Sequence, residues 1–127
     1  SPCACLSGDS GAGNLPVQKT EAAEKPLPRL LELGAHQCIP CKQMAPIIEA
    51  LTQEFRGVLR VEFIDVWQAE NQERAKAYGI QSIPTQIFLD AQGRELWRHV
   101  GFISREDILN KWTELGYVLK PREPGKP

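Results

Sequence analysis

Two cysteines three positions apart are the residues of this chain best suited to chemistry. The run Cys38-Ile39-Pro40-Cys41 stands directly before a segment with apolar residues at helical spacing. The unpaired N–H groups and partial positive charge of a helix N-terminus stabilise a thiolate. We therefore expect Cys38 to be the exposed attacking sulfur. Cys41 lies one turn further into the helix, close enough to form a disulfide with Cys38, and should be the more buried, resolving thiol.

A zinc site and inert packing are two other interpretations of these cysteines. Further zinc ligands would have to come from Cys3, Cys5, His36 and His99. The second Cys-x-x-Cys pair that is usual in such sites does not occur in the sequence. Inert packing is disfavoured because a helix start is where a thiol becomes reactive. Redox chemistry without a bound metal is therefore the favoured interpretation.

The hydrophobic pattern indicates which elements position the cysteines. Strands are predicted at 30–33, 58–66, 86–90 and 95–100, and helices from Cys38 to Gly57, at 70–78 and from Ser104 to Gly116. Pro46 lies inside the first of these helices and should interrupt and kink it. Helices that alternate with strands imply a parallel pair, and the closing hairpin adds antiparallel strands. The fold class is therefore α/β, with a mixed sheet and helices on both faces.

Composition indicates one domain with flexible ends. The chain has 127 residues, and Ser, Gly, Ala and Pro dominate residues 1–26, which predicts a flexible leader with one short helix at 19–25. The domain should then span 27–119, and 120–127 should be a flexible tail. Lys and Arg total 15 against 16 Asp and Glu, so the charge balance does not favour nucleic acid or an anionic membrane as partner. No apolar run approaches the 18 or so residues of a membrane-spanning helix.

Three landmarks in register resemble the thioredoxin family. Lys42 follows the Cys-Ile-Pro-Cys run and Pro46 lies five residues past Cys41, as in the active-site helix of that family. The segment 78–85, Tyr-Gly-Ile-Gln-Ser-Ile-Pro-Thr, is similar to the segment that holds the family's cis-proline, and Val-Gly-Phe at 100–102 is similar to the loop before the last helix. The resemblance covers about residues 27–115. It implies a thioredoxin fold, a central mixed sheet flanked by helices on both faces.

The resemblance also implies where a substrate would bind. Pro84 would be cis, which would bring the backbone of Ile83 beside Cys38 to pair with a substrate strand. On the residues alone, an ordinary trans proline at a strand start is the alternative. The substrate surface would be apolar, and its members would be Ile39, Pro40, Ile83, Pro84 and Phe102, with Thr85 just behind.

Two further side chains near the cysteines are candidates for proton and charge effects. Glu32 stands inside the predicted strand 30–33, six residues before Cys38, where many thioredoxins carry a buried Asp. Burial would raise the pKa of Glu32 and suit it to accept a proton from Cys41, directly or through a water. The alternative is that Glu32 points outward at a strand edge. His36 could stabilise the Cys38 thiolate when charged, or be an exposed loop residue.

The expected activity is that of a thiol:disulfide oxidoreductase. Its partners would be protein disulfides or dithiols, and it would need no cofactor, act as a monomer and be a reductant rather than an oxidant. Thioredoxins usually carry Trp before the first cysteine and Gly-Pro between the two, whereas this chain has Gln37 and Ile39-Pro40 there, so the family's potential does not carry over. A redox-inert thioredoxin-fold adaptor and a zinc-binding structural module are the alternatives.

The first strand and the long first helix that are usual in the thioredoxin family are shortened in this sequence, which resembles exported thioredoxin-like proteins. The resemblance implies a periplasmic or exported location and electrons from a membrane thiol-reductant conduit, with a cytoplasmic location as the alternative. Ala4-Cys5 has the small residue that precedes a lipid-modified cysteine, so an export-signal remnant and a lipid anchor are one interpretation of the leader. Cys3 and Cys5 could otherwise be a second redox pair, metal ligands or unstructured thiols.

Overall fold

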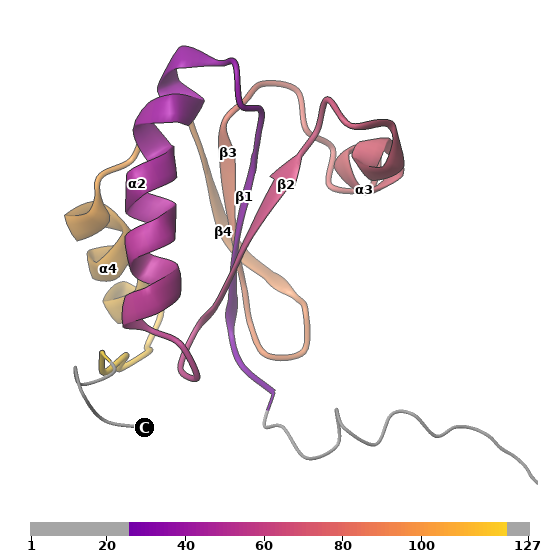
Figure 1. The fold of residues 1–127 in the computed structure, drawn as a ribbon. Helices are drawn as coiled ribbons and strands as arrows, with labels where there is room; N and C mark the ends of the chain where they lie inside the picture. Colours follow the sequence, from indigo (N-terminus) through magenta and orange to yellow (C-terminus); the bar gives the residue numbers. More distant parts are fainter. Residues whose placement is uncertain (1–25, 122–127) are drawn as a thin grey trace, which may run out of the picture.

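A four-stranded mixed sheet with helices on both faces makes up the described part of the chain, residues 26–121 of the computed structural model (Figure 1). The strands are β1 (Arg29–Gly34), β2 (Arg60–Asp65), β3 (Thr85–Leu89) and β4 (Glu95–Val100). The helices are α2 (Ile39–Glu54), the 3-10 turn η2 (Ala69–Asn71), α3 (Gln72–Ala77) and α4 (Arg105–Glu114). The predicted helix at 19–25, the cysteines at 3 and 5 and nearly all of the predicted leader and tail lie outside the described residues.

The order of the strands, β2-β1-β3-β4, places β1 in the middle of the sheet. β1 and β2 are parallel and joined through α2, whereas β3 pairs antiparallel with both β1 and β4. Leu33, near the end of β1, pairs with Thr85 at the start of β3. The loop that enters β3 therefore lies beside the end of β1, from which the chain turns into α2.

Side chains alternate between two apolar layers, one on each face of the sheet. Leu30 and Phe88 pack with α2 and α4 on one face, around the fully buried Trp112. Leu31 and Ile87 belong to the layer on the other face, where α3 lies (Figure 1). A residue of β1 is therefore covered whichever way its side chain points, and this applies to Glu32 as well.

Helix α2 differs from the prediction at one position. It runs as a single helix from Ile39 to Glu54 with Pro46 inside it, so the predicted interruption is wrong. Pro46 is on the exposed side of the helix, where water can bond to the carbonyl left without its N–H partner. Met44, Ile48 and Leu51 are buried on the opposite side and hold both halves of the helix against the sheet.

The helix predicted at 70–78 is instead two shorter pieces, η2 and α3. Neither piece begins with a side-chain cap, since Gln68 and Asn71 make no capping hydrogen bond. The side chain of Asn71 donates instead to the backbone oxygen of Asp65. Without a cap the first turn tightens into a 3-10 turn before α3 begins.

Candidate active site

Cys38 is the N-cap residue of α2, and its sulfur faces the start of the helix. Cys38 Sγ accepts a hydrogen bond from the backbone N–H of Cys41 at 3.4 Å. Cys41 Sγ accepts one from the backbone N–H of Ala35 at 3.5 Å and is 4% exposed. Cys38 is half-buried, and neither of these two thiols is in a disulfide. The structure thus places the attacking candidate at the surface side and the resolving candidate beneath it.

The surroundings of Cys41 keep it protonated at neutral pH. Burial, followed by the hydrogen bond with Cys38, raises the pKa of the Cys41 thiol to about 12, against the lowering effect of the Ala35 N–H. The nearby Cys38 and Glu32 add repulsion toward a negative charge on the sulfur. A reaction that uses Cys41 as a nucleophile therefore needs a base to take its proton.

Glu32 is buried at 1% exposure in the central strand, so it does not point outward at an edge. Its Oε1 accepts a hydrogen bond from Gln86 Nε2 at 3.0 Å, and its Oε2 has no hydrogen-bond partner among the described residues. Burial raises the pKa of Glu32 to about 7, although the hydrogen bond from Gln86 acts in the opposite direction. A carboxyl with this pKa can both take and return a proton near neutral pH.

Gly34 brings Glu32 and Cys41 to the same place. A Cβ atom at this position would lie 2.9 Å from Cys41 Sγ and 3.6 Å from Glu32 Oε2. The sulfur and the free carboxylate oxygen therefore share the space that any larger residue would fill. In the sequence, Gly34 indicated only the end of a strand. A glycine between a strand and a Cys-x-x-Cys run was the available signal.

The loop before β3 contains a cis peptide bond and is held by two hydrogen bonds. The Ile83–Pro84 peptide bond is cis, Pro84 is buried, and its carbonyl accepts a hydrogen bond from the Gly101 N–H at 2.7 Å. Thr85 is 2% exposed and its hydroxyl donates to the Ser82 carbonyl at 2.6 Å. Thr85 therefore supports this loop from behind and cannot touch a substrate with its side chain.

Two of the apolar side chains that were predicted to contact a substrate are exposed. Ile39 is 70% exposed and Phe102 47%, whereas Pro40 and Ile83 are half-buried. Ile39, the first residue of α2, directly follows Cys38, so one of these exposed side chains borders the dithiol.

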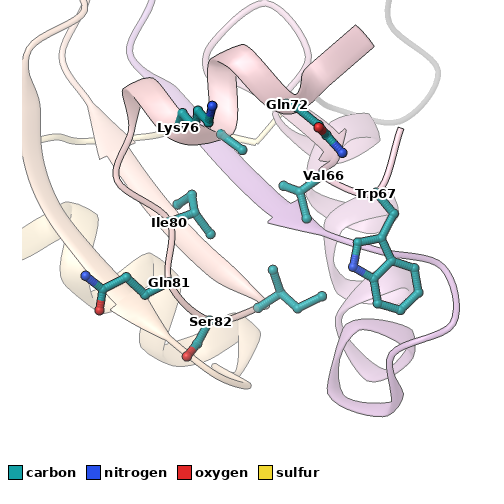
Figure 2. A pocket seen from close by; sticks show the side chains of 9 residues that line it. Val66, Trp67, Gln72, Lys76, Ile80, Gln81 and Ser82 are labelled. Atoms are coloured by element: carbon teal, nitrogen blue, oxygen red, sulfur yellow. The ribbon is translucent and has the colours of Figure 1, made fainter. Parts of the chain in front are cut away.

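A second apolar feature, which sequence reasoning missed, lies beside the Pro84 loop. Figure 2 shows a groove between α3 and this loop, with Val66, Trp67 and Ile80 along it. The Trp67 side chain is 58% exposed. The available signal in the sequence was a tryptophan, Trp67, directly after the predicted strand 58–66.

His36 lies against β2. Its Nε2 is 3.6 Å from Asp65 Oδ2, and its ring centroid is 5.2 Å from that of Phe63. The side chain is 73% exposed. The structure thus gives His36 a carboxylate and an aromatic partner on β2, at a largely exposed position of the loop.

Residues 26–121 contain neither a metal-ligand cluster nor a membrane-spanning helix. No three side chains of His, Cys, Asp or Glu in this range come together as metal ligands would. No helix in the same range is long and apolar enough to cross a membrane.

Thioredoxins from several organisms are similar in sequence to this chain. The thioredoxin family model matches residues 18–114. A thioredoxin of Bacillus subtilis is 41% identical over 85 residues, which are 65% of this chain and 79% of that protein. A thioredoxin of Rickettsia conorii is 34% identical over 92 residues, which are 72% of this chain and 85% of that protein.

Solved structures of thioredoxins have the same fold as this chain. The germline-specific thioredoxin Deadhead of Drosophila melanogaster has a TM-score of 0.62 and 30% identity, over 77% of this chain and 89% of that one. A mutant thioredoxin from Halobacterium salinarum has a TM-score of 0.62 and 26% identity, over 72% of this chain and 77% of that one. The chain therefore belongs to the thioredoxin family and is a thioredoxin-like disulfide oxidoreductase.

Proposed function

We propose that this chain reduces disulfides in protein substrates through Cys38 and Cys41. The Cys38 thiolate attacks one sulfur of the substrate disulfide, which forms a mixed disulfide and releases the other substrate sulfur as a thiolate. Cys41 then loses its proton and attacks Cys38 Sγ, which releases the second substrate sulfur. The products are a Cys38–Cys41 disulfide and a reduced substrate. The observation that carries the proposal is the placement of Cys38 Sγ at the N-terminus of α2, with Cys41 buried behind it.

The proton of Cys41 goes to Glu32 in this proposal. Its support is the buried Oε2 atom, which lacks a partner among residues 26–121 and shares the space around Gly34 with Cys41 Sγ. Ionised Glu32 accepts the proton as Cys41 attacks, either directly or through a water, and the buried carboxyl becomes neutral.

The substrate strand would lie across the apolar surface around the cysteines. The backbone of Ile83 would pair with it, and Ile39, Pro40 and Phe102 would contact its side chains. Pro84 would shape the loop. This part of the proposal is supported by the register that sets Thr85 beside Leu33 and by the exposure of Ile39 and Phe102.

The reducing direction in this proposal is supported by the similarity of the chain to thioredoxins. Cys41 does not decide the direction, because burial raises its pKa to about 12 and a thiol with an ordinary pKa of 9 is also protonated at neutral pH. The potential of the Cys38–Cys41 pair therefore tests the direction.

Insulin reduction driven by dithiothreitol tests the activity. We expect the wild-type chain to accelerate insulin precipitation and Cys38→Ser to remain at the uncatalysed rate with an unchanged unfolding midpoint. Equilibration with glutathione should give a potential nearer about −270 mV than about −120 mV. Wild-type protein at the uncatalysed rate would favour the redox-inert adaptor. Stoichiometric zinc in the purified protein would instead favour the structural module.

The finer predictions about cellular context stay predictions of the sequence. They are the periplasmic or exported location, the lipid anchor, the membrane thiol-reductant conduit and the monomeric state. Cys3 and Cys5, on which the export interpretation depends, lie outside residues 26–121.

A further inference from the structure

A polar row crosses three neighbouring strands on the face of the sheet that α2 covers. Glu32 of β1 pairs in register with Gln86 of β3, and Gln86 pairs in register with His99 of β4. Glu32 is 1% exposed, Gln86 is fully buried, and His99 is half-buried. The next row along the same strands, Leu30, Phe88 and Trp97, is apolar. A fully buried glutamine next to this apolar row needs hydrogen-bond partners for both its amide nitrogen and its amide oxygen.

The hydrogen bonds along this row have one direction when Glu32 is ionised. A carboxylate only accepts, so Gln86 must turn its amide nitrogen toward Glu32, where Nε2 and Oε1 are 3.0 Å apart. The amide oxygen of Gln86 then faces His99 Nδ1 at 3.0 Å and requires a hydrogen on that nitrogen. The chain of donors therefore runs from His99 through Gln86 to one oxygen of Glu32.

The same series of hydrogen bonds determines which carboxylate oxygen of Glu32 stays free. Because Oε1 is held by Gln86, the other oxygen, Oε2, is left on the side of Gly34 and Cys41 Sγ. The apolar surroundings strengthen each hydrogen bond of the row, and the Trp97 ring, 5.9 Å from that of His99, packs against its outer end.

We propose that Gln86 and His99 are positioning residues that hold the Glu32 carboxyl with Oε2 directed at Cys41. Neither residue touches the reacting sulfurs. Each acts through Glu32, and the role rests on the function proposed above. The outer side of His99 faces a groove that Phe102 also lines, so the row connects the rim of the predicted substrate surface to the buried carboxyl.

The pH dependence of resolution, measured on a pre-formed Cys38 mixed disulfide, tests this role. Gln86→Leu removes the donor to Glu32, so the charged carboxyl is less stabilised. The pH midpoint of the rise in resolution rate should therefore move up by about one pH unit. His99→Phe keeps the ring against Trp97 but loses the Nδ1 donor, so its midpoint should move the same way by less. His99→Asn places an amide N–H near the position of Nδ1 and should restore the wild-type midpoint.

Other titratable groups near this row stay constant in the comparison. Those that face Glu32 or line the adjacent cavity are Cys41, Lys42, Glu49 and His36, and those in the groove beside His99 are Asp107, Lys111 and Glu114. Arg98→Gln is the matched control because this neighbour of His99 reaches Tyr78 on the other face of the sheet. Its midpoint should equal that of the wild type.

The outcomes separate this inference from the proposed function. Unchanged midpoints in Gln86→Leu and in His99→Phe, with normal insulin reduction, would overturn the positioning role alone. If Gln86→Leu does not fold, the comparison of His99→Phe with His99→Asn decides. A carbon-13 NMR titration of the Glu32 carboxyl in the reduced protein measures the same shift without turnover. It therefore tests the row even if insulin reduction fails.

Discussion

Cys38 and Cys41 belong to the same helical turn, yet their sulfurs have different surroundings. Cys38 Sγ caps the helix and is half-buried, whereas Cys41 Sγ is buried behind it with one backbone donor. A thiol that keeps its proton cannot attack, so Cys41 is the sulfur whose reactivity depends on a neighbour. This difference predicts different phenotypes for the two serine variants.

Cys41→Ser should accumulate a mixed disulfide between Cys38 and the substrate, because the first attack remains and only the resolving attack is lost. Cys38→Ser should trap nothing, since its nucleophile is absent. Mass spectrometry after mixing with an oxidised protein substrate detects the adduct. Trapping by Cys38→Ser but not by Cys41→Ser would show that the two roles are reversed.

Glu32→Gln should slow resolution at pH 8 by about 100-fold, the lower end of what a positioned base contributes. In the wild type the resolution rate should rise as pH increases through about 7, where Glu32 loses its proton. The amide has no proton to lose, so this rise should be missing in the variant. Stopped-flow measurements between pH 6 and 9 give both profiles, and identical profiles would remove Glu32 from the mechanism.

At the scale of elements, the junction of β1 and α2 determines how the base meets the thiol. β1 ends at Gly34 and α2 begins at Ile39, so only a short turn separates Glu32 from the cysteines. The turn can bring Cys41 Sγ against the strand because Gly34 has no side chain.

Gly34→Ala should therefore disturb both stability and resolution. The new methyl group would lie 2.9 Å from Cys41 Sγ, so the start of α2 has to move away from β1. We expect a loss of about 1 to 3 kcal/mol in the free energy of unfolding, the usual range for overpacking. Urea titration and the resolution rate measure the two effects. Gln37→Ala, at an exposed position of the same turn, is the control that should change neither.

At the scale of the whole molecule, a carboxyl buried under α2 makes folding stability depend on pH. Both faces of the sheet are covered, so Glu32 is almost fully buried in the folded state. Its pKa is about 7 when folded, against 4.5 for an exposed glutamate. Between these two values the folded state binds more protons than the unfolded state.

The stability of the reduced wild type should fall as pH rises from about 4.5 to about 7 and then level off. The carboxyl's contribution is complete below pH 4.5, and the full loss corresponds to about 3 kcal/mol. Glu32→Gln should lack this dependence and be more stable than the wild type at pH 8. Urea unfolding at several pH values measures it, and parallel curves for the two proteins would show that Glu32 is not desolvated.

The sequence alone determined the order of the elements, the position of the dithiol and the family. These depend on local information: apolar spacing defines β1, α2 and the hairpin, and Cys38 and Cys41 are only three residues apart. One prediction made from local information, the interruption of α2, is wrong. A proline favours an interruption of α2 at Pro46, but tertiary packing of Met44 and Leu51 keeps the helix continuous.

Only the tertiary structure decided what surrounds Glu32. Gln86 and His99 are far from it in the chain, and the polar row exists because three strands pair in one particular register. A shift of one residue in either pairing would move the partner to the opposite face. The approach of Glu32 and Cys41 to the same space beside Gly34 likewise depends on how closely α2 packs on β1, a distance that residue types and spacing do not contain.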